Sequence, residues 1–324
     1  LQPSNSKEVN TPPSKKNPFN INADEIIINK GALAIDSDFE NPYPNFDGTH
    51  LNFFGINASI KNVFVSEKEI KAIISLSAKE RSGLVVKKLN TSFTFNPSIM
   101  EFSNLDLLTN RSRIGNYYAM KFTNFNEDFN NYNSNVVMIA NIKESTIHTD
   151  DITFFAPAMS IFKTKALLSG NYKGTVENFT VNQLQLKTGG NSVLTGTFSM
   201  KGLPAIETTQ ITLEKGFAQS NYKDLAQFIP AIQNIKNPNF ASLGTILYRG
   251  DFKGTTFDFV TKGVFSSALG GINTDINLKL PKKGEASYKG NLETLAFNLG
   301  KFTNNADLGA IDFKGSIEGS SFNL

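Results

Sequence analysis

The sequence contains no cysteine and no tryptophan, and its only histidines are His50 and His148. Without cysteine, the chain has no disulfide, no thiolate nucleophile and no cysteine-ligated metal site. Two histidines, far apart in the sequence, do not indicate a histidine-rich metal site or a histidine-based catalytic triad. We therefore expect no metal and no other cofactor. A composition without cysteine fits many bacterial extracytoplasmic proteins.

Long apolar runs and clustered charge are also missing. No run reaches the roughly 18 apolar residues that a membrane-spanning helix needs. The net charge of +3 comes from interspersed basic and acidic residues, whereas nucleic-acid binding favours a clustered basic face. We therefore expect no nucleic-acid partner. The 28 phenylalanines, in a chain without tryptophan, supply apolar mass that carries no hydrogen-bonding group.

The two ends of the chain suggest an interior fragment of a longer protein. The sequence begins at Leu1 without methionine or a charged-then-apolar leader, and it ends at Leu324 soon after a repeated motif. Residues 1–18 are polar and include four prolines, so we expect a disordered linker there. We divide the rest into two β-rich segments, residues 19–148 and 149–324.

A motif with two glycines four residues apart and an apolar residue midway occurs three times. The copies are Leu168–Gly174 (LSGNYKG), Tyr248–Gly254 (YRGDFKG) and Phe313–Gly319 (FKGSIEG). The last two belong to a longer match between Asn239–Gly254 and Asn304–Gly319. Repeats at about 65 to 80 residues are typical of an array of similar units, which forms an extended surface or conduit more often than one active site.

The glycines of this motif do not indicate a phosphate-binding loop. Such a loop needs a helix directly after the glycines, but the residues that follow here favour a strand. We interpret the glycines as structural: they mark turns, or positions in a strand where the backbone bends or a neighbour approaches closely. They are Gly170, Gly174, Gly250, Gly254, Gly315 and Gly319.

A second motif contains an aspartate, a phenylalanine and a proline, and it occurs at Asp151–Ala158 (DITFFAPA) and Asp224–Ala231 (DLAQFIPA). We interpret both copies as short helices, capped at their start and stopped by proline, that plug an end of a sheet. In the first copy, Asp150 or Asp151 is the expected cap. The alternative, catalytic carboxylates at Asp151 and Asp224, lacks a partner acid at a fixed offset. A glycosidase pair from distant parts of the chain stays open, although no pattern points to one.

Most of the remaining chain alternates apolar and polar residues, which predicts strands with one apolar face. The clearest run is Ile272–Leu280. Ile26–Ile35 predicts a hairpin that turns at Asn29-Lys30-Gly31. Further helices are expected only at Asn124–Tyr132 and Ser220–Ile229, so helices are too few to cover a sheet.

An apolar sheet face can be hidden by a second sheet, by closure into a barrel, or by an apolar molecule lying in a trough. The repeats and the one-faced strands favour the last arrangement. We therefore predict an all-β fold, an elongated and curved antiparallel sheet with a U-shaped apolar groove. The candidate lining residues are Ile74, Leu76, Phe93, Phe95, Leu184, Leu186, Leu194, Phe198, Ile211, Leu213, Ile272, Ile276, Leu278 and Leu280.

Several segments resemble one protein family. Leu168–Pro204 (LSGNYKGTVENFTVNQLQLKTGGNSVLTGTFSMKGLP) resembles the TamB-like members of the AsmA superfamily, the translocation and assembly module, in the form found in Bacteroidota. Asp224–Ile232, Ala241–Pro281 and Asn304–Gly319 are similar to the same family. The resemblance covers roughly residues 19–324, and its motifs are structural rather than catalytic.

The resemblance implies a function as well as a fold. Members of the family are anchored in the inner membrane and carry a β-rich, taco-like body with an apolar groove across the periplasm. The implied activity is bridge-like transport of phospholipids, held by their acyl chains, toward the outer membrane, without catalysis. An outer-membrane barrel partner would bind through regions outside this fragment. The alternatives are a scaffold for outer-membrane protein assembly and an extracellular β-sandwich hydrolase or adhesin.

Overall fold

The computed structural model describes residues 19–37, 41–157, 160, 163–228, 233, 237–281 and 285–320. The expected linker, residues 1–18, lies outside the described residues. The same is true of Ala158 and of residues 229–232, where the two proline-containing motifs end.

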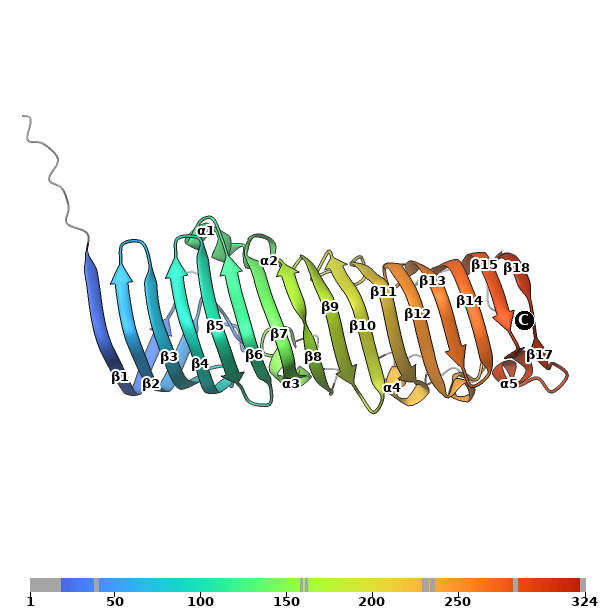
Figure 1. Cartoon of the computed structure of the whole chain (residues 1–324), viewed down its shortest axis with the longest axis horizontal. Helices are drawn as coiled ribbons and strands as arrows, with labels where there is room; N and C mark the ends of the chain where they lie inside the picture. The colour runs from blue at the N-terminus through green and yellow to red at the C-terminus, as the bar shows by residue number, and fades with distance from the viewer. Residues whose placement is uncertain are drawn as a thin grey trace, which may run out of the picture.

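Sixteen strands form one antiparallel sheet, in which strands that follow one another in the chain also lie next to one another. Figure 1 shows them side by side along the long axis of the molecule, with β1 at one end and β18 at the other. A second sheet among the described residues contains only β16 and β17. The predicted all-β fold, an elongated, curved antiparallel sheet with few short helices, is confirmed.

The strands of the large sheet are β1 Asn20–Ile35, β2 Leu51–Ser66, β3 Ile70–Glu80, β4 Val85–Asn96, β5 Ile99–Leu108, β6 Arg113–Lys121, β7 Val137–His148, β8 Lys165–Gly174, β9 Asn178–Thr188, β10 Ser192–Lys201, β11 Gln210–Asn221, β12 Thr245–Gly254, β13 Asp258–Ser267, β14 Gly270–Lys279, β15 Ser287–Leu295 and β18 Lys314–Ser320. The small sheet pairs β16 Phe297–Asn298 with β17 Ala310–Ile311. The helices are α1 Phe125–Asn130, α2 Tyr132–Asn135, α3 Thr149–Ile152, α4 Tyr222–Phe228, the 3₁₀ helix η3 Phe240–Leu243 and α5 Leu299–Thr303.

Alternating side chains explain why these segments form strands with two different faces. In β13, exposed and half-buried residues alternate along the whole strand. Successive side chains of a strand point to opposite faces, so this pattern leaves one polar and one apolar face. The helices lie at the two long edges of the sheet. Figure 1 shows α1 and α2 at one edge and α3, α4 and α5 at the other.

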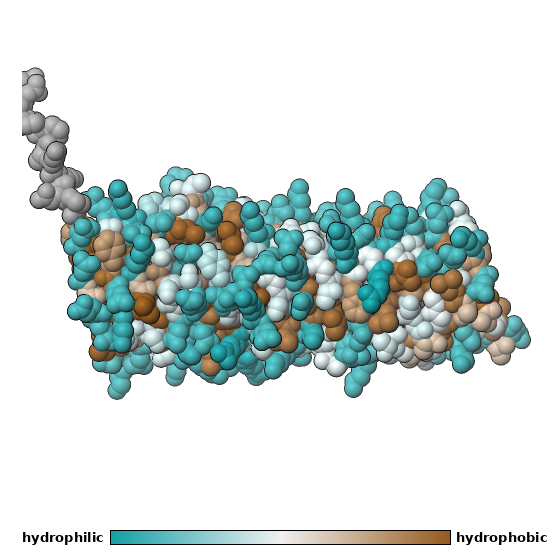
Figure 2. Space-filling model, viewed as in Figure 1, coloured by the Kyte–Doolittle hydropathy of each residue, from teal (hydrophilic) through white to brown (hydrophobic). Residues whose placement is uncertain are grey.

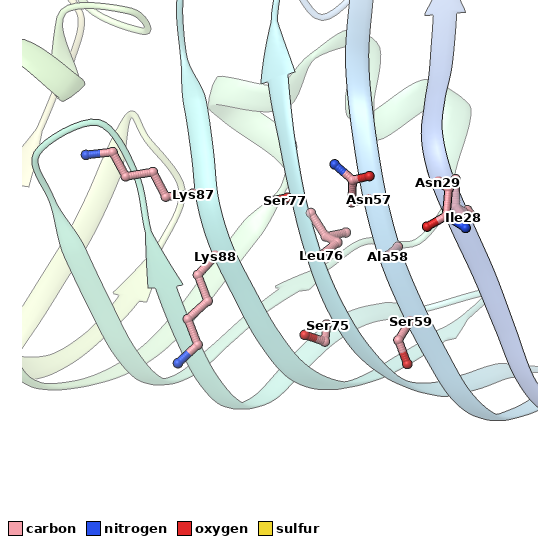
Figure 3. Close-up of a pocket in the computed structure, with 10 residues that line it drawn as sticks. All are labelled: Ile28, Asn29, Asn57, Ala58, Ser59, Ser75, Leu76, Ser77, Lys87 and Lys88. Carbon is pink, nitrogen blue, oxygen red and sulfur yellow. The ribbon is translucent and has the colours of Figure 1, made fainter.

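Bulges interrupt the strands over most of the sheet. Every neighbouring pair from β1–β2 to β11–β12 contains a register shift, whereas no pair from β12–β13 to β15–β18 contains one. At several of these shifts lies a polar residue with positive φ, as at Lys30, Asn62, Asn104, Glu144, Gln183 and Lys215. Bulges bend a strand and increase its twist. Figure 3 shows strands at the β1 end turning near the bottom of the view, so that the sheet curves.

Each of these bulges also changes which residues share a face. In β9, Val181 pairs with Phe198, and Leu184 pairs with Gly196. Phe198 and Gly196 are two residues apart on β10 and therefore face the same side. Val181 and Leu184, three residues apart, must then face that side too. The extra residue allows the apolar pattern to resume on the same face after each bend.

The predicted hairpin at Ile26–Ile35 is wrong. These residues belong to the single strand β1, in which Lys30 has a φ of 54° and the register shifts beside Gly31. The Asn-Lys-Gly sequence makes a bulge instead of a turn, because β2 pairs with β1 on both sides of it. The boundary placed between residues 148 and 149 falls between β7 and β8, which pair like the other neighbours, so the sheet continues across it.

The two aspartates of the second motif fasten neighbouring turns. One oxygen of Asp151, Oδ2, accepts hydrogen bonds from Thr109 Oγ1 at 2.5 Å and from the backbone amides of Arg111 at 3.0 Å and Ser112 at 2.7 Å. The expectation that Asp150 or Asp151 caps its own helix is wrong, since His148 occupies that position in α3. Asp151 instead ties α3 to the turn between β5 and β6.

Asp224 makes the equivalent connection farther along the sheet. Its carboxylate accepts hydrogen bonds from the amides of Gly190 and Asn191 at 3.1 and 2.9 Å and from Ser192 Oγ at 2.9 Å. The side chain of Asn221 accepts the amide hydrogen of Asp224 and thereby caps the start of α4. Both motif copies therefore tie a short helix to the turn that precedes it by two strands.

The longer repeat also brings equivalent residues together. Asn239 and Asn304 begin the two matching segments, and Asn239 Nδ2 donates to Asn304 Oδ1 at 3.2 Å. Phe240 packs against Phe302 with ring centroids 5.8 Å apart. The connections that precede β12 and β18 therefore contact each other along one edge of the sheet.

Asp224→Asn is expected to lower the free energy of unfolding at pH 7 by about 1–3 kcal/mol, because an amide cannot replace a buried carboxylate that accepts three hydrogen bonds. Burial would raise the pKa of Asp224, but the hydrogen bonds from Asn191, Gly190 and Ser192 outweigh it and hold that pKa below its ordinary value. The stabilisation is therefore fully present above about pH 4 and is lost as the pH falls through the folded-state pKa.

Urea unfolding of both proteins at pH 7 and at low pH measures this effect, and the difference between them should shrink in acid. Asp275→Asn is the matched control. Asp275 is 47% exposed and pairs with Lys262 at 3.1 Å, so the change should cost no more than about 1 kcal/mol. If Asp224→Asn costs the same free energy at both pH values, the ionised carboxylate of Asp224 does not stabilise the fold as stated.

Candidate functional site

Cross-strand pairing aligns apolar residues into a row that crosses the whole sheet. Directly paired residues in antiparallel strands lie on the same face. Row A contains one residue from each strand, from β1 to β18: Ile21, Val65, Ile70, Phe95, Met100, Met120, Met138, Gly174, Phe179, Met200, Ile211, Gly254, Phe259, Leu278, Tyr288 and Gly319. It is unbroken from one end of the sheet to the other.

Two more rows run parallel to row A on the same face. Row B, from β3 to β18, is Ala72, Phe93, Phe102, Tyr118, Ala140, Tyr172, Val181, Phe198, Leu213, Phe252, Thr261, Ile276, Gly290 and Ile317. Row C lies beyond the bulges and is Ile28, Ala58, Leu76, Leu89, Leu107 and Ile114, followed by Ser145, Leu168, Leu186, Leu194, Ala218, Tyr248, Phe265, Ile272 and Thr294. We call the surface formed by rows A, B and C the apolar face.

None of the residues in these three rows is charged. The opposite face, in contrast, carries charged residues. The row that lies between A and B on that side is Lys71, Thr94, Glu101, Ala119, Ile139, Lys173, Thr180, Ser199, Thr212, Lys253, Val260, Asn277, Lys289 and Glu318. On the side of the molecule shown in Figure 2, hydrophobic patches occur along the length, and hydrophilic residues line both long edges.

The pairing places the candidate lining residues on one face. Phe95, Ile211 and Leu278 belong to row A, Phe93, Phe198, Leu213 and Ile276 to row B, and Leu76, Leu186, Leu194 and Ile272 to row C. Ile74 and Leu184 lie between rows B and C, and Leu280 follows β14 two residues after Leu278. Contact of these residues with a lipid stays a prediction.

The lining residues expected from the sequence do not include the part of the apolar face on β5 to β8. Met100, Met120 and Met138 are consecutive members of row A, and Tyr118 and Tyr172 belong to row B. In β6 and β7 apolar residues occur on both faces, as in Tyr117-Tyr118-Ala119-Met120, so the alternation is weak there. The register of the neighbouring strands is the signal that identifies the inward-facing residues.

Exposure shows that the apolar face is not the inside of a filled core. Among the candidate residues only Leu184 and Leu213 are buried, with 5% and 7% exposure, and the others are half-buried. The side chains of the apolar face therefore remain partly accessible.

The hydroxyl groups on the apolar face bond to one another or to the backbone. Tyr172 Oη donates to the carbonyl oxygen of Thr175 at 3.0 Å, and Tyr248 Oη donates to that of Asp251 at 2.6 Å. Thr261 Oγ1 donates to Tyr248 Oη at 3.0 Å. Burial raises the pKa of Tyr172, so its phenol stays neutral. These groups satisfy one another's hydrogen bonds and leave the rings to form an apolar surface.

The six motif glycines lie within strands β8, β12 and β18 and not in turns, which agrees with the interpretation that they are strand positions approached closely by a neighbour. They allow a close approach between strands. A Cβ atom on Gly250 would lie 2.2 Å from the carbonyl oxygen of Lys262, and one on Gly254 would lie 2.2 Å from that of Asp258. The ring of Tyr248 lies against Gly250 and its partner Gly263, so the missing side chains make room for an aromatic ring. Gly174 and Gly254 also end their strands just before a turn.

Gly250→Ala is expected to destabilise the protein by about 2–4 kcal/mol, because the added methyl group overlaps the backbone of β13 and the backbone has a φ of +157°. Gly48→Ala is the matched control, since a Cβ atom at Gly48 meets nothing within 4 Å. Thermal or urea unfolding of both variants measures the costs. Equal costs at the two positions would contradict a packing role for Gly250.

A pocket of 380 Å³ at the β1 end is drawn in Figure 3. Its lining combines row C residues with serines and with Lys87 and Lys88. Ser59 Oγ donates to Glu25 Oε1 at 2.7 Å, and Ser75 Oγ donates to Asn90 Oδ1 at 2.8 Å. The two serines therefore form links between neighbouring strands, which is a structural arrangement and not that of an activated nucleophile.

The histidines and the candidate carboxylates also have structural contacts. His50 is buried, with Nδ1 3.0 Å from Asp47 Oδ2. His148 Nδ1 accepts the amide hydrogen of Asp150 at 3.2 Å. Burial would raise the pKa of Asp151, but hydrogen bonds from Thr109, Arg111 and Ser112 hold it below its ordinary value. A general base works best with a pKa near the working pH, so this carboxylate suits an anchor better than a base.

In the part of the chain that the structure describes, no three His, Asp or Glu side chains are grouped so that they could hold a metal ion. No helix within that part is both long and apolar enough to span a membrane. Comparison with protein-family models, with curated proteins and with solved structures finds no match. The resemblance to TamB-like proteins therefore stays a prediction.

Proposed function

We propose that the apolar face binds the acyl chains of phospholipids and carries them along the sheet without catalysis or a cofactor. The observation that supports this most is the uncharged row A, which crosses all sixteen strands while its side chains remain partly accessible. With strands about 4.8 Å apart, the sheet spans about 70 Å, more than twice the hydrocarbon thickness of a bilayer, about 30 Å.

The chemistry of an acyl chain fits such a face. The chain has no hydrogen-bonding groups, so it needs no specific polar contacts, and its transfer out of water contributes about 0.8 kcal/mol per methylene group. Successive positions along row A differ little in polarity, so movement from strand to strand meets a low barrier. The charged headgroup would stay at the edges of the sheet, in water.

The cellular setting is part of the same proposal. As the resemblance implies, the chain would be a segment of a periplasmic bridge that carries phospholipids between the inner and outer membranes. The parent protein would be anchored in the inner membrane, and an outer-membrane barrel protein would bind through other regions. The cysteine-free composition fits that compartment.

Phe198→Asp and Ser199→Asp test the proposal with neighbouring residues on opposite faces of β10. A charge at Phe198 must be desolvated against a passing acyl chain, which costs a few kcal/mol and should slow phospholipid transfer between vesicles by about tenfold or more. The same charge at Ser199 points to the polar face and should leave transfer near the wild-type rate. Native mass spectrometry should show less bound phospholipid only for Phe198→Asp.

Phe198→Leu and circular dichroism separate a blocked path from a damaged fold. The leucine variant keeps an apolar side chain and should transfer lipid at close to the wild-type rate. Leu278→Asp places the charge elsewhere on row A and should repeat the effect of Phe198→Asp. If the wild-type protein neither binds nor transfers phospholipid, the proposed function is wrong.

One observation favours the alternative of a scaffold for outer-membrane protein assembly. The edge strand β1 exposes large apolar side chains on both faces, including Ile27 at 64%, Leu33 at 50% and Ile35 at 49%. An open edge of this kind can pair with a strand of another polypeptide. The client would be an unfolded strand of a membrane barrel protein.

A photo-crosslinker placed at Ile27 should capture unfolded barrel clients if β1 is a docking edge. The control position is Val264 on β13, which is 41% exposed but lies between two paired neighbours. Crosslinks from Ile27 alone would favour the scaffold. Equal or absent capture at both positions would leave phospholipid transport as the better proposal.

A further inference from the structure

The connection between β6 and β7 contains the helices α1 and α2. At the same edge, the neighbouring pairs β4–β5 and β8–β9 are joined by short turns at residues 97–98 and 175–177. Figure 1 shows α1 and α2 at this edge of the sheet, in the half of the row of strands that contains β1. The connection therefore adds two short helices that these neighbouring turns lack.

Aromatic side chains of this connection lie on the apolar face. Phe125 packs edge-on against Phe95 of row A, with ring centroids 5.6 Å apart, and it stacks on Phe129 at 4.3 Å. Tyr132 Oη lies 3.2 Å from Tyr118 Oη in row B and 3.6 Å from Met120 Sδ in row A. The helices thus extend inward from the edge and cover rows A and B on β4 to β6.

The surface beneath this cover is rich in methionine. On the three successive strands β5, β6 and β7, the members of row A are Met100, Met120 and Met138. Methionine is unbranched and flexible, so it adapts to irregular and changing neighbours. Tyr132 of the cover rests on Met120, whose flexible side chain can adapt when the cover moves away and returns.

The two ends of the cover make different contacts. At its start, the buried carboxylate of Asp128 fixes the turn into α1, because it accepts the amide hydrogens of Thr123 at 2.6 Å and Asn124 at 3.1 Å. At its end, Ser134 Oγ donates to Glu177 Oε1 at 2.8 Å, and the amide of Glu177 donates to the carbonyl oxygen of Asn133 at 3.0 Å. Ser134 and Asn133 are exposed, so water competes for these last bonds.

We propose that α1 and α2 form a cover that closes the apolar face at β4 to β6 and opens from its Glu177 attachment when an acyl chain passes. The inference rests on the proposed lipid transport and adds a gate to it. The start of the cover, where Asp128 fixes the turn into α1, stays in place. The aromatic rings of Phe125, Phe129 and Tyr132 occupy the path of the lipid when the cover is closed.

Ser134→Cys combined with Glu177→Cys locks the cover. The natural chain has no cysteine, so the pair forms only one disulfide, which a reductant opens again. Oxidised protein should transfer fluorescent phospholipid between vesicles at least about tenfold more slowly than reduced protein, because a lid that cannot open limits passage. Phospholipid already bound elsewhere on the face should be retained in both states, as native mass spectrometry would show.

Thr180→Cys combined with Ser199→Cys is the matched control, since these residues pair on the polar face of β9 and β10. Its oxidation should leave transfer unchanged. Tyr132→Ala gives the converse measurement, because it removes the contacts with Tyr118 and Met120 and should raise the transfer rate. If the locking disulfide fails to form, Tyr132→Ala still tests the gate.

Equal transfer by the oxidised and reduced lock, or by Tyr132→Ala and the wild type, would overturn the gate and leave lipid transport intact. Absence of transfer by the wild-type protein would instead overturn the proposed function. The two failures are therefore distinguishable in one set of assays.

Discussion

The antiparallel register between neighbouring strands is the constraint on which the rest of this structure depends. Because side chains alternate between faces, a slip of one residue in β8 or β12 would bring a charged residue, Lys173 or Lys253, into the row that now holds only uncharged groups. The bulges meet this requirement while they bend the strands. Each inserted residue, such as Gln183 in β9, allows the apolar residues on both sides of the bend to face the same way.

A sheet with one uncovered apolar face must gain stability elsewhere. Here the strands are held at the edges by buried carboxylates, Asp151 and Asp224, which accept hydrogen bonds from neighbouring turns. The motif glycines bring adjacent strands close enough for aromatic rings to lie flat on the sheet. These contacts are local and repeat along the sheet, so the array can be long without a central core.

The same architecture suits the proposed binding of acyl chains, which requires no defined pocket. An acyl chain needs exclusion from water more than it needs directed contacts, and a continuous uncharged row would supply that exclusion at every strand. Control over the movement of a lipid would then require a further structural element at the edge of the sheet. The connection with α1 and α2 is such an addition, and the flexible methionines beneath it would allow it to move.

The amino-acid sequence by itself determined the all-β fold, the one-faced strands and the repeated motifs, because alternation of polarity is a local property that a short segment displays. It also selected apolar residues that pairing places on one face, from Ile74 in β3 to Leu278 in β14. Tertiary structure alone decided that Asn29-Lys30-Gly31 is a bulge and not a turn, since that outcome depends on the pairing of β2 across it. It likewise decided that Met100, Met120 and Met138 align and that Asp151 binds a turn about 40 residues before it, because these relations join segments whose spacing in the chain carries no periodic signal.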